Sequence, residues 1–393
     1  MPKQWTRRDF LRTAGTSLVA VALDKKWSWQ NLAADSSATT RFYVGTYTDT
    51  SSQGIYQGWL DLKSGAMRTE VAATKVVNPS FLTIAPSGQF LYAVNEVTAF
   101  DGSPTGAASA FAVDGESGRL RFLNARSSGG QDPCYITYDR AGHFLLVANY
   151  TSGSFAVLRM QADGGLAPPF PIVKDQGSGP NRVRQEGPHV HCVAVAPDNR
   201  FVIVADLGID RLMIYAFDAE TGSLSPAKVP FCAMPPGSGP RHLVFHPDGK
   251  SIFVINELLS TVARLSYRPD TGECVVKQIV STLPRGYTGT NTAAEICVDA
   301  AGRHLYCSNR GHDSVAVFRI QPGSHRLSLV QHQSTQGSFP RSIAIDPSGT
   351  FLLAANQHSE SIVSFAVDKK RGTLTPTGRS TNLGSPVCIA FMP

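Results

Sequence analysis

The chain has 393 residues, of which 42% are hydrophobic and 17% charged, and it contains 35 Gly and 25 Pro. This composition describes a soluble protein with a sizeable core, in which turns are frequent and long helices are not expected. The formal net charge is +6, but residues 1–34 hold six basic and two acidic residues, so only +2 remains for residues 35–393. So weak a charge gives no electrostatic reason to expect nucleic-acid or membrane binding, and no segment from residue 41 onward has the roughly 18 unbroken apolar residues of a membrane helix.

Residues 1–34 predict an export signal with a spacer. Arg7 and Arg8 precede the apolar pair Phe10 and Leu11, and a short uncharged run follows at residues 13–23. This order is typical of a twin-arginine signal, so we expect the twin-arginine export machinery as a partner and a periplasmic or secreted protein. A disordered basic tail is the alternative, and a leader that does not function would leave the protein cytoplasmic.

From residue 78 onward one template recurs six times. It consists of a Pro or small residue, an alternating strand, a turn with Gly or Asn, a second apolar strand, and then Asn or Asp. The turn residues stand 54, 57, 50, 53 and 47 positions apart, at Gly88, Gly142, Asn199, Gly249, Gly302 and Gly349. A period of this length is typical of propeller blades with four strands each.

A second signature, Asp-x-x-x-Gly-x-Leu or a near variant, marks seven outer hairpins. Its glycines are Gly65, Gly118, Gly164, Gly222, Gly272, Gly323 and Gly372. The seventh inner hairpin is divided between the ends of the chain, because residues 385–393 match the first strand of the template and residues 41–46 match the second. Pairing of these ends would remove the free sheet edges. The sequence therefore predicts an all-β fold: residues 35–393 form a single seven-bladed β-propeller, closed by its N- and C-terminal strands.

The seven cysteines are odd in number and include no C-x-x-C pair. Cys192, Cys297, Cys307 and Cys388 lie in apolar, strand-like runs, where cysteine behaves as a small hydrophobic residue. Mostly free, buried thiols are expected. That agrees better with export of an already folded protein than with a disulfide framework.

Residue types that occur in every blade are expected to be structural, and those that break the pattern need another reason. The Asn or Asp after each second strand occurs in six blades and is predicted to bond nearby backbone. Charge gathers instead at strand ends in the third to sixth inner hairpins, in His189, His191, Arg241, His242, Glu257, Glu295, Arg310 and Arg341. Strand starts line the central channel, so this set predicts a concave polar site for a small ligand.

Structural interpretations stand beside the functional ones. Arg241 and Glu257 could form an ion pair that only stabilises the fold. His242 could be a core histidine with its hydrogen bonds satisfied, and Arg341 could lie on a solvated face. His246 precedes a turn proline and is predicted to be a surface turn residue.

Glu96 repeats the Asn-Glu pair of the later blade, but its own blade lacks the other charges, so it receives no catalytic role.

The motifs that carry these charges resemble a known family. They are His189-Val190-His191, Gly239-Pro240-Arg241-His242, Asn256-Glu257-Leu258, Ala294-Glu295-Ile296 and Asn309-Arg310-Gly311. They are similar to motifs of the lactonase family that includes propeller-type 6-phosphogluconolactonases and carboxy-cis,cis-muconate cyclases, and the resemblance spans residues 41–393.

The resemblance implies an active site formed by the histidine of the His-x-His motif with Arg241, Glu257 and Arg310. Val190 stands where a proline is common in the family, which leaves open which histidine faces the site. The repeat places His191 in register with Arg241, so His191 is preferred. His189, His242, Glu295 and Arg341 are expected to bind substrate.

Lactone hydrolysis needs an activated water and a stabilised oxyanion. Glu257 or His191 would accept the proton of the water, and Arg241 and Arg310 would stabilise the oxyanion or hold an anionic substituent. The expected partner is therefore a small anionic or sugar lactone, and export favours an unphosphorylated one. If the leader does not function, 6-phosphogluconolactone becomes the leading substrate.

Two other functions remain open: a lactonising cyclase of the carboxymuconate type, and a non-catalytic propeller that binds a small anion. No cofactor and no metal are expected, because no tight ligand spacing such as HExxH occurs. A metal-dependent variant would require some of His189, His191, His242, Glu257 and Glu295 to converge.

Overall fold

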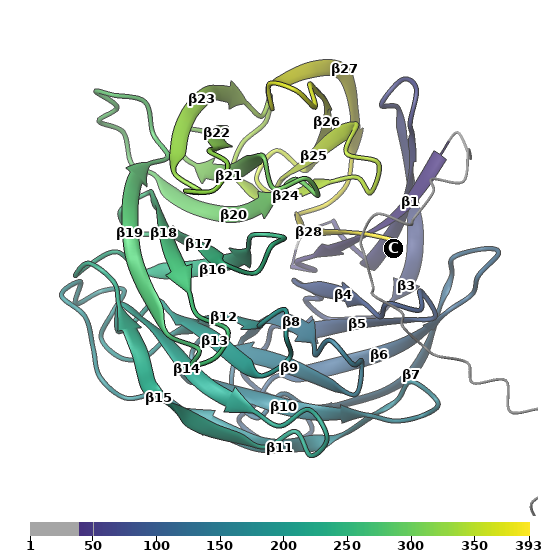
Figure 1. Cartoon of the computed structure of the whole chain (residues 1–393). Coiled ribbons are helices and arrows are strands. Elements are labelled where there is room, and N and C mark those ends of the chain that lie inside the picture. The colour runs from purple at the N-terminus through teal and green to yellow at the C-terminus, as the bar shows by residue number, and fades with distance from the viewer. Residues whose placement is uncertain (1–38, 50) are drawn as a thin grey trace, which may run out of the picture. The chain divides into compact units, whose positions relative to one another are not determined.

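A computed structural model describes residues 39–49 and 51–393, so the predicted export signal lies outside the described residues. The described chain forms seven four-stranded antiparallel sheets arranged as a ring (Figure 1). The predicted seven-bladed β-propeller is confirmed. Within residues 39–49 and 51–393, no helix has the length and apolar character needed to span a membrane.

The first four sheets contain consecutive strands of the chain, except that the C-terminal strand joins the first sheet. The first sheet contains β28 (Pro386–Phe391), β1 (Thr39–Thr46), β2 (Gly54–Asp61) and β3 (Met67–Thr74). The second contains β4 (Leu82–Ile84), β5 (Phe90–Asn95), β6 (Ala107–Val113) and β7 (Leu120–Ser127). The third contains β8 (Pro133–Tyr138), β9 (Phe144–Asn149), β10 (Ser154–Met160) and β11 (Leu166–Lys174). The fourth contains β12 (Val190–Val195), β13 (Phe201–Asp206), β14 (Arg211–Phe217) and β15 (Leu224–Ala233).

The remaining three sheets repeat the same order. The fifth contains β16 (Pro240–Phe245), β17 (Ser251–Asn256), β18 (Thr261–Tyr267) and β19 (Cys274–Ser281). The sixth contains β20 (Thr292–Val298), β21 (His304–Arg310), β22 (Ser314–Ile320) and β23 (Leu327–Ser334). The seventh contains β24 (Pro340–Ile345), β25 (Phe351–Asn356), β26 (Ser361–Val367) and β27 (Leu374–Asn382).

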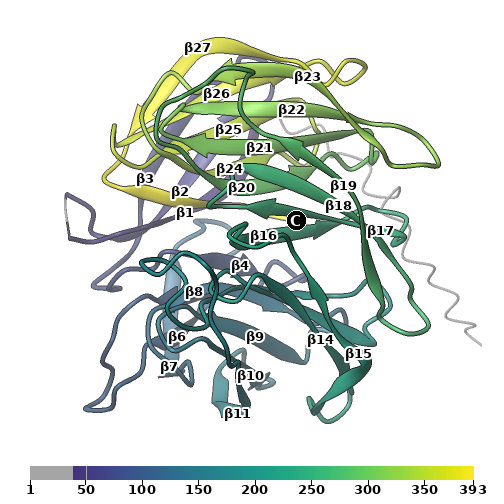
Figure 2. The same cartoon turned by 90° about the vertical axis from the view of Figure 1, so that its left-hand side faces the viewer.

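The ring closes where the sequence predicts it. β28 pairs antiparallel with β1, with Phe42 opposite Phe391 and Gly45 opposite Cys388. Figure 1 shows the strand from the C-terminal end of the chain beside β1, in the sheet that the N-terminal strands complete, and Figure 2 shows the same ring turned by 90°. Closure gives β1 a hydrogen-bonded neighbour, so β1 is not a free edge of its sheet.

The hydrophobic core lies between neighbouring sheets. All six residues of β13 are buried, because one face packs on the preceding blade and the other on the following one. Ile203 of β13, for example, belongs to the same cluster as Ile252 and Val254 of the next sheet. The uninterrupted apolar runs of the second strands are the sequence pattern that this double burial requires.

The turn residues behave as their types predict. Gly65 adopts a φ of 70°, and its N–H donates to Asp61 O at 2.9 Å in the first outer hairpin. At the other end of the blades, the Asn or Asp that closes a second strand bonds backbone in five of the six blades: Asn149, for example, donates to Ser128 O at 3.0 Å, and Asn309 donates to Thr282 O at 2.8 Å. The exception is Asn256, which donates to the hydroxyl of Thr261.

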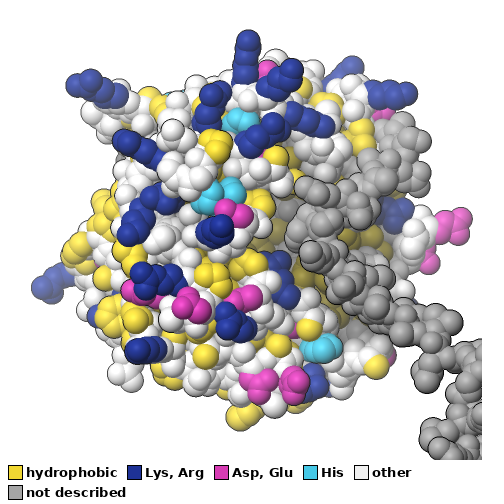
Figure 3. All heavy atoms as spheres, viewed as in Figure 1, with side chains coloured by type: hydrophobic (Ala, Val, Ile, Leu, Met, Phe, Trp, Pro, Cys, Tyr) yellow, Lys and Arg dark blue, Asp and Glu magenta, His cyan; other side chains and the backbone are white. Residues whose placement is uncertain are grey.

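All seven cysteines are free, which confirms that prediction, and five of them are buried. Cys232 and Cys297 are half-buried. On the surface, Figure 3 shows basic, acidic and apolar side chains intermixed over one face of the described ring.

Candidate active site

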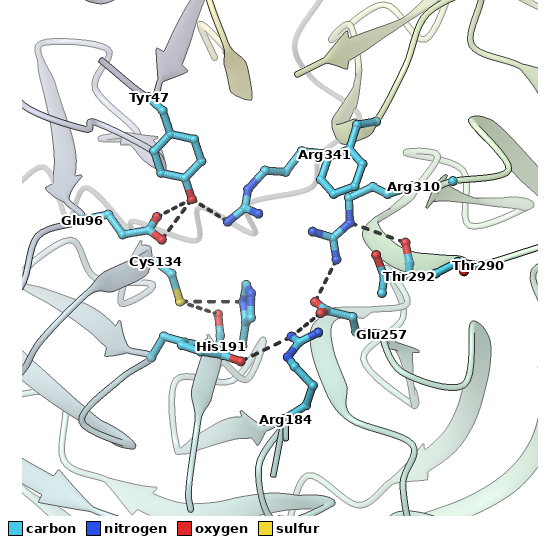
Figure 4. Close-up of a pocket in the computed structure, with 13 residues that line it drawn as sticks. Tyr47, Glu96, Cys134, Arg184, His191, Glu257, Thr290, Thr292, Arg310 and Arg341 are labelled. Carbon is cyan, nitrogen blue, oxygen red and sulfur yellow. Dashed lines mark hydrogen bonds and ion pairs between the residues drawn. The ribbon is translucent and has the colours of Figure 1, made fainter. Parts of the chain in front are cut away.

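A cavity of about 610 Å³ opens where the first strands of the blades begin and the second strands end. Its wall consists of Tyr47, Glu96, Cys134, Tyr150, Arg184, His191, Glu257, Thr290, Thr292, Arg310, Gly311, Phe339 and Arg341. Figure 4 shows the labelled side chains of this set pointing into one space from several blades. The cavity therefore occupies the position at which the sequence predicts a polar site.

β-Bulges aim several side chains at the channel. The register of β12 shifts between Val190 and Cys192, so His191 is the extra residue opposite β13. The same shift occurs around Cys134, Arg241 and Arg341 in the equivalent strands. A bulge turns a side chain out of the ordinary pleat. The position after the template proline, where the variable side chains lie, is therefore the bulged position of each strand.

Glu257 is the centre of an ion-pair network. Its Oε1 lies 2.6 Å from Arg184 Nη2, and its Oε2 lies 2.9 Å from Arg310 Nη2 and 3.1 Å from Arg241 Nε. Burial raises the pKa of this carboxyl, but Arg310, Arg241 and Arg184 outweigh it and lower the pKa to about 2. A carboxylate with so low a pKa is a weak proton acceptor at neutral pH.

Arg241 lies behind the cavity wall. Its side chain is 2% exposed, and its Nη1 donates to Ala294 O at 2.7 Å. Together with the contact to Glu257, this bond holds the guanidinium away from the cavity. The structure thus places Arg241 against Glu257, and Arg241 does not line the cavity.

Arg310, by contrast, lines the cavity. Its Nη2 also donates to Ala293 O at 3.2 Å, and its guanidinium carbon lies 5.1 Å from the ring centre of Phe339. Burial lowers the pKa of Arg310 to about 9, and the Glu257 carboxylate opposes that shift. The side chain is therefore a fixed cation at neutral pH.

His242 and Glu295 form a buried pair beneath Arg241. His242 Nδ1 lies 2.8 Å from Glu295 Oε1, and Arg241 Nη1 lies 3.3 Å from His242 Nε2. Burial lowers the pKa of His242 to about 4. Neither residue lines the cavity, so the structure does not bring the predicted binding residues His242 and Glu295 to the site surface.

The two histidines of the His-x-His motif face different surroundings. His191 lines the cavity, with its Nδ1 3.7 Å from Cys134 Sγ. The ring of His189 stacks on Tyr150 at 4.4 Å, and its Nε2 lies 3.0 Å from Glu186 Oε1. Between the two, only His191 presents its imidazole to the cavity.

The electrostatic surroundings keep His191 neutral. Burial lowers the pKa of His191 well below 6.5, and the charges of Arg241 and Arg341 lower it further. A neutral imidazole on the wall of a polar cavity has a lone pair that can accept a proton from a bound water or substrate, although its lowered pKa makes it a weaker base than a free imidazole.

A second hydrogen-bonded group stands across the cavity. Arg341 Nη2 donates to Tyr47 Oη at 2.8 Å, and Tyr47 donates to the Glu96 carboxylate at 2.9 Å. Ser80 also donates to Glu96. Burial raises the pKa of Tyr47 above its ordinary range, so its phenol remains a donor at neutral pH. Figure 4 shows this group opposite Glu257 and Arg310.

Several wall residues were missed from the sequence. Arg184 lies between β11 and β12, outside the repeat template, so no column of the repeat contains it. Tyr47 follows β1 in the split blade, at the position that Glu96, Tyr150 and Glu257 occupy in others. Extending that column to the split blade would have found Tyr47. In the structure, Tyr47 connects Glu96 to the charged side chain of Arg341.

The five residues considered for a metal do not converge. Glu257 is held by arginines, His189 turns toward Tyr150 and Glu186, and His242 pairs with Glu295 below the wall. The cavity instead presents Arg184, Arg310 and Arg341, a set suited to an anionic or oxygen-rich ligand.

Comparison with known proteins agrees with the fold and the motifs. The chain is 38% identical over 354 residues to a 6-phosphogluconolactonase of Bacillus subtilis (strain 168), covering 89% of this chain and 97% of that protein. It is 33% identical over 343 residues to a 6-phosphogluconolactonase of Formosa agariphila, covering 84% and 94%. Among solved structures, a periplasmic gluconolactonase of Pseudomonas aeruginosa matches with a TM-score of 0.84 and 34% identity, over 90% of this chain and 99% of that one.

A family model described as "Lactonase, 7-bladed beta-propeller" matches residues 41–391. This match covers the whole described ring except its terminal residues, and it includes every cavity residue named above. The chain therefore belongs to the lactonase family of seven-bladed β-propellers.

Proposed function

We propose that this protein hydrolyses a small sugar or organic-acid lactone in the cavity. The observation that carries the proposal is the meeting of a neutral imidazole, His191, with three guanidinium groups in one polar cavity. Such a wall combines a proton acceptor with fixed positive charge, and ester hydrolysis needs both.

In the proposed reaction, His191 accepts a proton from a water molecule as that water attacks the lactone carbonyl. The carbonyl oxygen becomes an oxyanion, and Arg310 stabilises it as a fixed cation. The ring C–O bond then breaks, and the leaving oxygen takes the proton from the His191 imidazolium. The product is the open hydroxy acid.

The remaining charged groups would bind the substrate or position other side chains. Arg341 and Arg184 would contact the hydroxyls or the anionic substituent of the substrate. Glu257 would hold Arg310 and Arg184 in place through the ion pairs described above, and Arg241 would hold Glu257. Glu257 is thus a positioning residue in this proposal, because its charge is already committed to three arginines.

The relatives support a sugar-acid lactone as substrate. A Bacillus subtilis relative is named 6-phosphogluconolactonase, and a Pseudomonas aeruginosa neighbour is called a periplasmic gluconolactonase. The twin-arginine signal predicted for residues 1–34 favours export, and unphosphorylated lactones are the better match outside the cytoplasm. We therefore propose gluconolactone or a similar unphosphorylated lactone as substrate, in the periplasm.

A pH-stat assay of the purified protein tests this proposal. Gluconolactone, freshly generated 6-phosphogluconolactone and a muconolactone are supplied in turn, with and without EDTA, and spontaneous hydrolysis is subtracted. Turnover of gluconolactone above background, unchanged by EDTA, is expected. Preference for the phosphorylated lactone would contradict the substrate assignment, and absence of turnover on all three would contradict the hydrolase assignment.

A further inference from the structure

Three potential metal ligands gather at the end of the ring opposite the cavity. His246 and Asp248 lie in the turn between β16 and β17, and His325 lies in the turn between β22 and β23 of the next sheet. One ligand atom from each lies within 4.8 Å of the others. β16 begins beside the cavity at Arg241 and ends at this turn, so the cluster is one strand length from the proposed active site.

The hydrogen bonds of His246 expose a lone pair to Asp248. His246 Nε2 lies 3.0 Å from Gly302 O, and a carbonyl can only accept, so Nε2 carries the hydrogen. The neutral ring then has its lone pair on Nδ1, which lies 2.7 Å from Asp248 Oδ1. At this distance either a proton on Nδ1 or a bound cation lies between the two atoms, and the backbone N–H of Asp248 also lies 3.3 Å from Nδ1.

His325 supplies a third acceptor to the same point. Its Nδ1 lies 2.8 Å from the hydroxyl of Ser251, which can accept the ring hydrogen and leave the lone pair on Nε2. That Nε2 lies 3.2 Å from Asp248 Oδ2. The two imidazole rings stack at 3.9 Å, so both present a nitrogen to the one carboxylate. Ring N–H groups could satisfy the two oxygens of Asp248 separately, whereas one metal ion could bind all three side chains.

The environment fits a bound ion with an open coordination position. The side chains of His246 and His325 are 12% and 7% exposed, while that of Asp248 is 36% exposed, so ion and water can enter from one side. Backbone and hydroxyl partners on the far ring nitrogens are the usual way in which ligating histidines are oriented.

We propose that His246, Asp248 and His325 bind a divalent transition-metal ion of the zinc type, with water as a fourth ligand. Two imidazoles and one carboxylate suit such an ion better than Ca²⁺ or Mg²⁺, which prefer oxygen ligands. The site departs from the sequence-based expectation of no metal, and from the prediction that His246 is a simple surface turn residue.

The ion would link two neighbouring blades. His246 and Asp248 belong to the fifth sheet and His325 to the sixth, and Gly302 of the sixth sheet fixes the His246 ring. A Cβ at Gly302 would lie 2.4 Å from His246 Nε2, so the close approach requires glycine. Because an ion that binds only the folded ring stabilises it, the site would act on stability and leave the chemistry in the cavity unaffected.

Zinc binding to the tag-free full-length protein tests this proposal. The protein is stripped with EDTA, titrated with Zn²⁺ by isothermal calorimetry, and then heated with and without zinc. Asp248→Asn and His325→Gln remove ligands, and His143→Ala is the matched control, because His143 lies exposed in the equivalent turn between β8 and β9.

One zinc ion per chain and a higher Tm with zinc are expected for the wild type. Asp248→Asn and His325→Gln should each weaken binding roughly tenfold or more and abolish the Tm increase, while His143→Ala behaves as the wild type. Lack of saturable binding in the wild type would overturn the proposal. So would equal binding in the two ligand variants, or an equal loss in the control.

Discussion

Replacing Glu257 with Gln removes the charge that three arginines share, two of which are buried. The substitution keeps the size of the side chain but leaves Arg184, Arg241 and Arg310 without the carboxylate that lies 2.6–3.1 Å from each. Arg241 and Arg310 are 2% and 6% exposed, so solvent cannot replace the lost partner. The variant should therefore be less stable and hold Arg310 less firmly.

Two arguments give a similar magnitude for this loss. Breaking a buried ion pair by removing one partner costs about 3–5 kcal/mol. The fall in the pKa of Glu257 from an ordinary 4.5 to about 2 corresponds to about 3 kcal/mol of stabilisation. Because the folded-state pKa is the lower one, this contribution is complete above pH 4.5 and is lost as pH falls toward 2.

Urea denaturation at pH 7 measures the effect, and Glu273→Gln is the matched control. Glu273 lies 3.0 Å from Arg268, but these side chains are 30% and 68% exposed. An exposed pair contributes roughly 0–1 kcal/mol, so the control should unfold almost as the wild type does. A loss for Glu257→Gln as small as that of the control would refute the view that this network is a buried electrostatic core.

Three further predictions concern pH and substrate. Because the pKa of His191 lies well below 6.5, the acid limb of kcat/KM should also lie below pH 6.5, and a limb at pH 7 would contradict the assignment of His191 as base. Arg341→Gln should raise KM about tenfold or more for a lactone with an anionic group and less for a neutral one; equal changes would show that Arg341 does not contact that group. Burial and the nearby Asp175 raise the pKa of Asp206 to about 8, so the folded state holds a proton that the unfolded state releases. Stability should therefore fall as pH rises from about 4 to 8, and Asp206→Asn should flatten this dependence in urea midpoints; an unchanged slope would argue against the shared proton.

The fold could be predicted from the sequence because each blade repeats the same physical requirement. Runs such as residues 201–206 are buried on both faces, so their apolar character recurs with every blade. The two half-hairpins at the ends of the chain follow the same pattern, and the observed pairing of β1 with β28 confirms the closure inferred from it.

The location of the cavity followed from the same repeat, but individual orientations did not. His191, Arg241 and Arg341 all sit at the same bulge position, and only His191 and Arg341 line the cavity. Arg241 turns beneath the wall because Ala294 O and Glu257 offer it buried partners. The orientation of Arg241 depends on a partner in another blade, so it cannot be predicted from the periodicity of one chain segment.

Residues outside the repeat could not be predicted by comparing the blades with one another. Arg184 reaches Glu257 from the connection between β11 and β12, where no template applies. His325 meets His246 across two blades at a separation of 79 positions, so no ligand spacing in the sequence marks the cluster that they form with Asp248. Contacts between residues far apart in the sequence could be identified only from the three-dimensional structure.

Lactone turnover by a pair of histidine variants tests the proposed reaction most directly. His191 and His189 are two positions apart, yet His191 lines the cavity and His189 stacks on Tyr150. With gluconolactone in a pH-stat, His191→Gln should lower kcat by roughly 10²–10⁴-fold, while His189→Gln should retain most of the activity. Equal losses in the two variants, or full activity in His191→Gln, would contradict hydrolysis by His191 in this cavity.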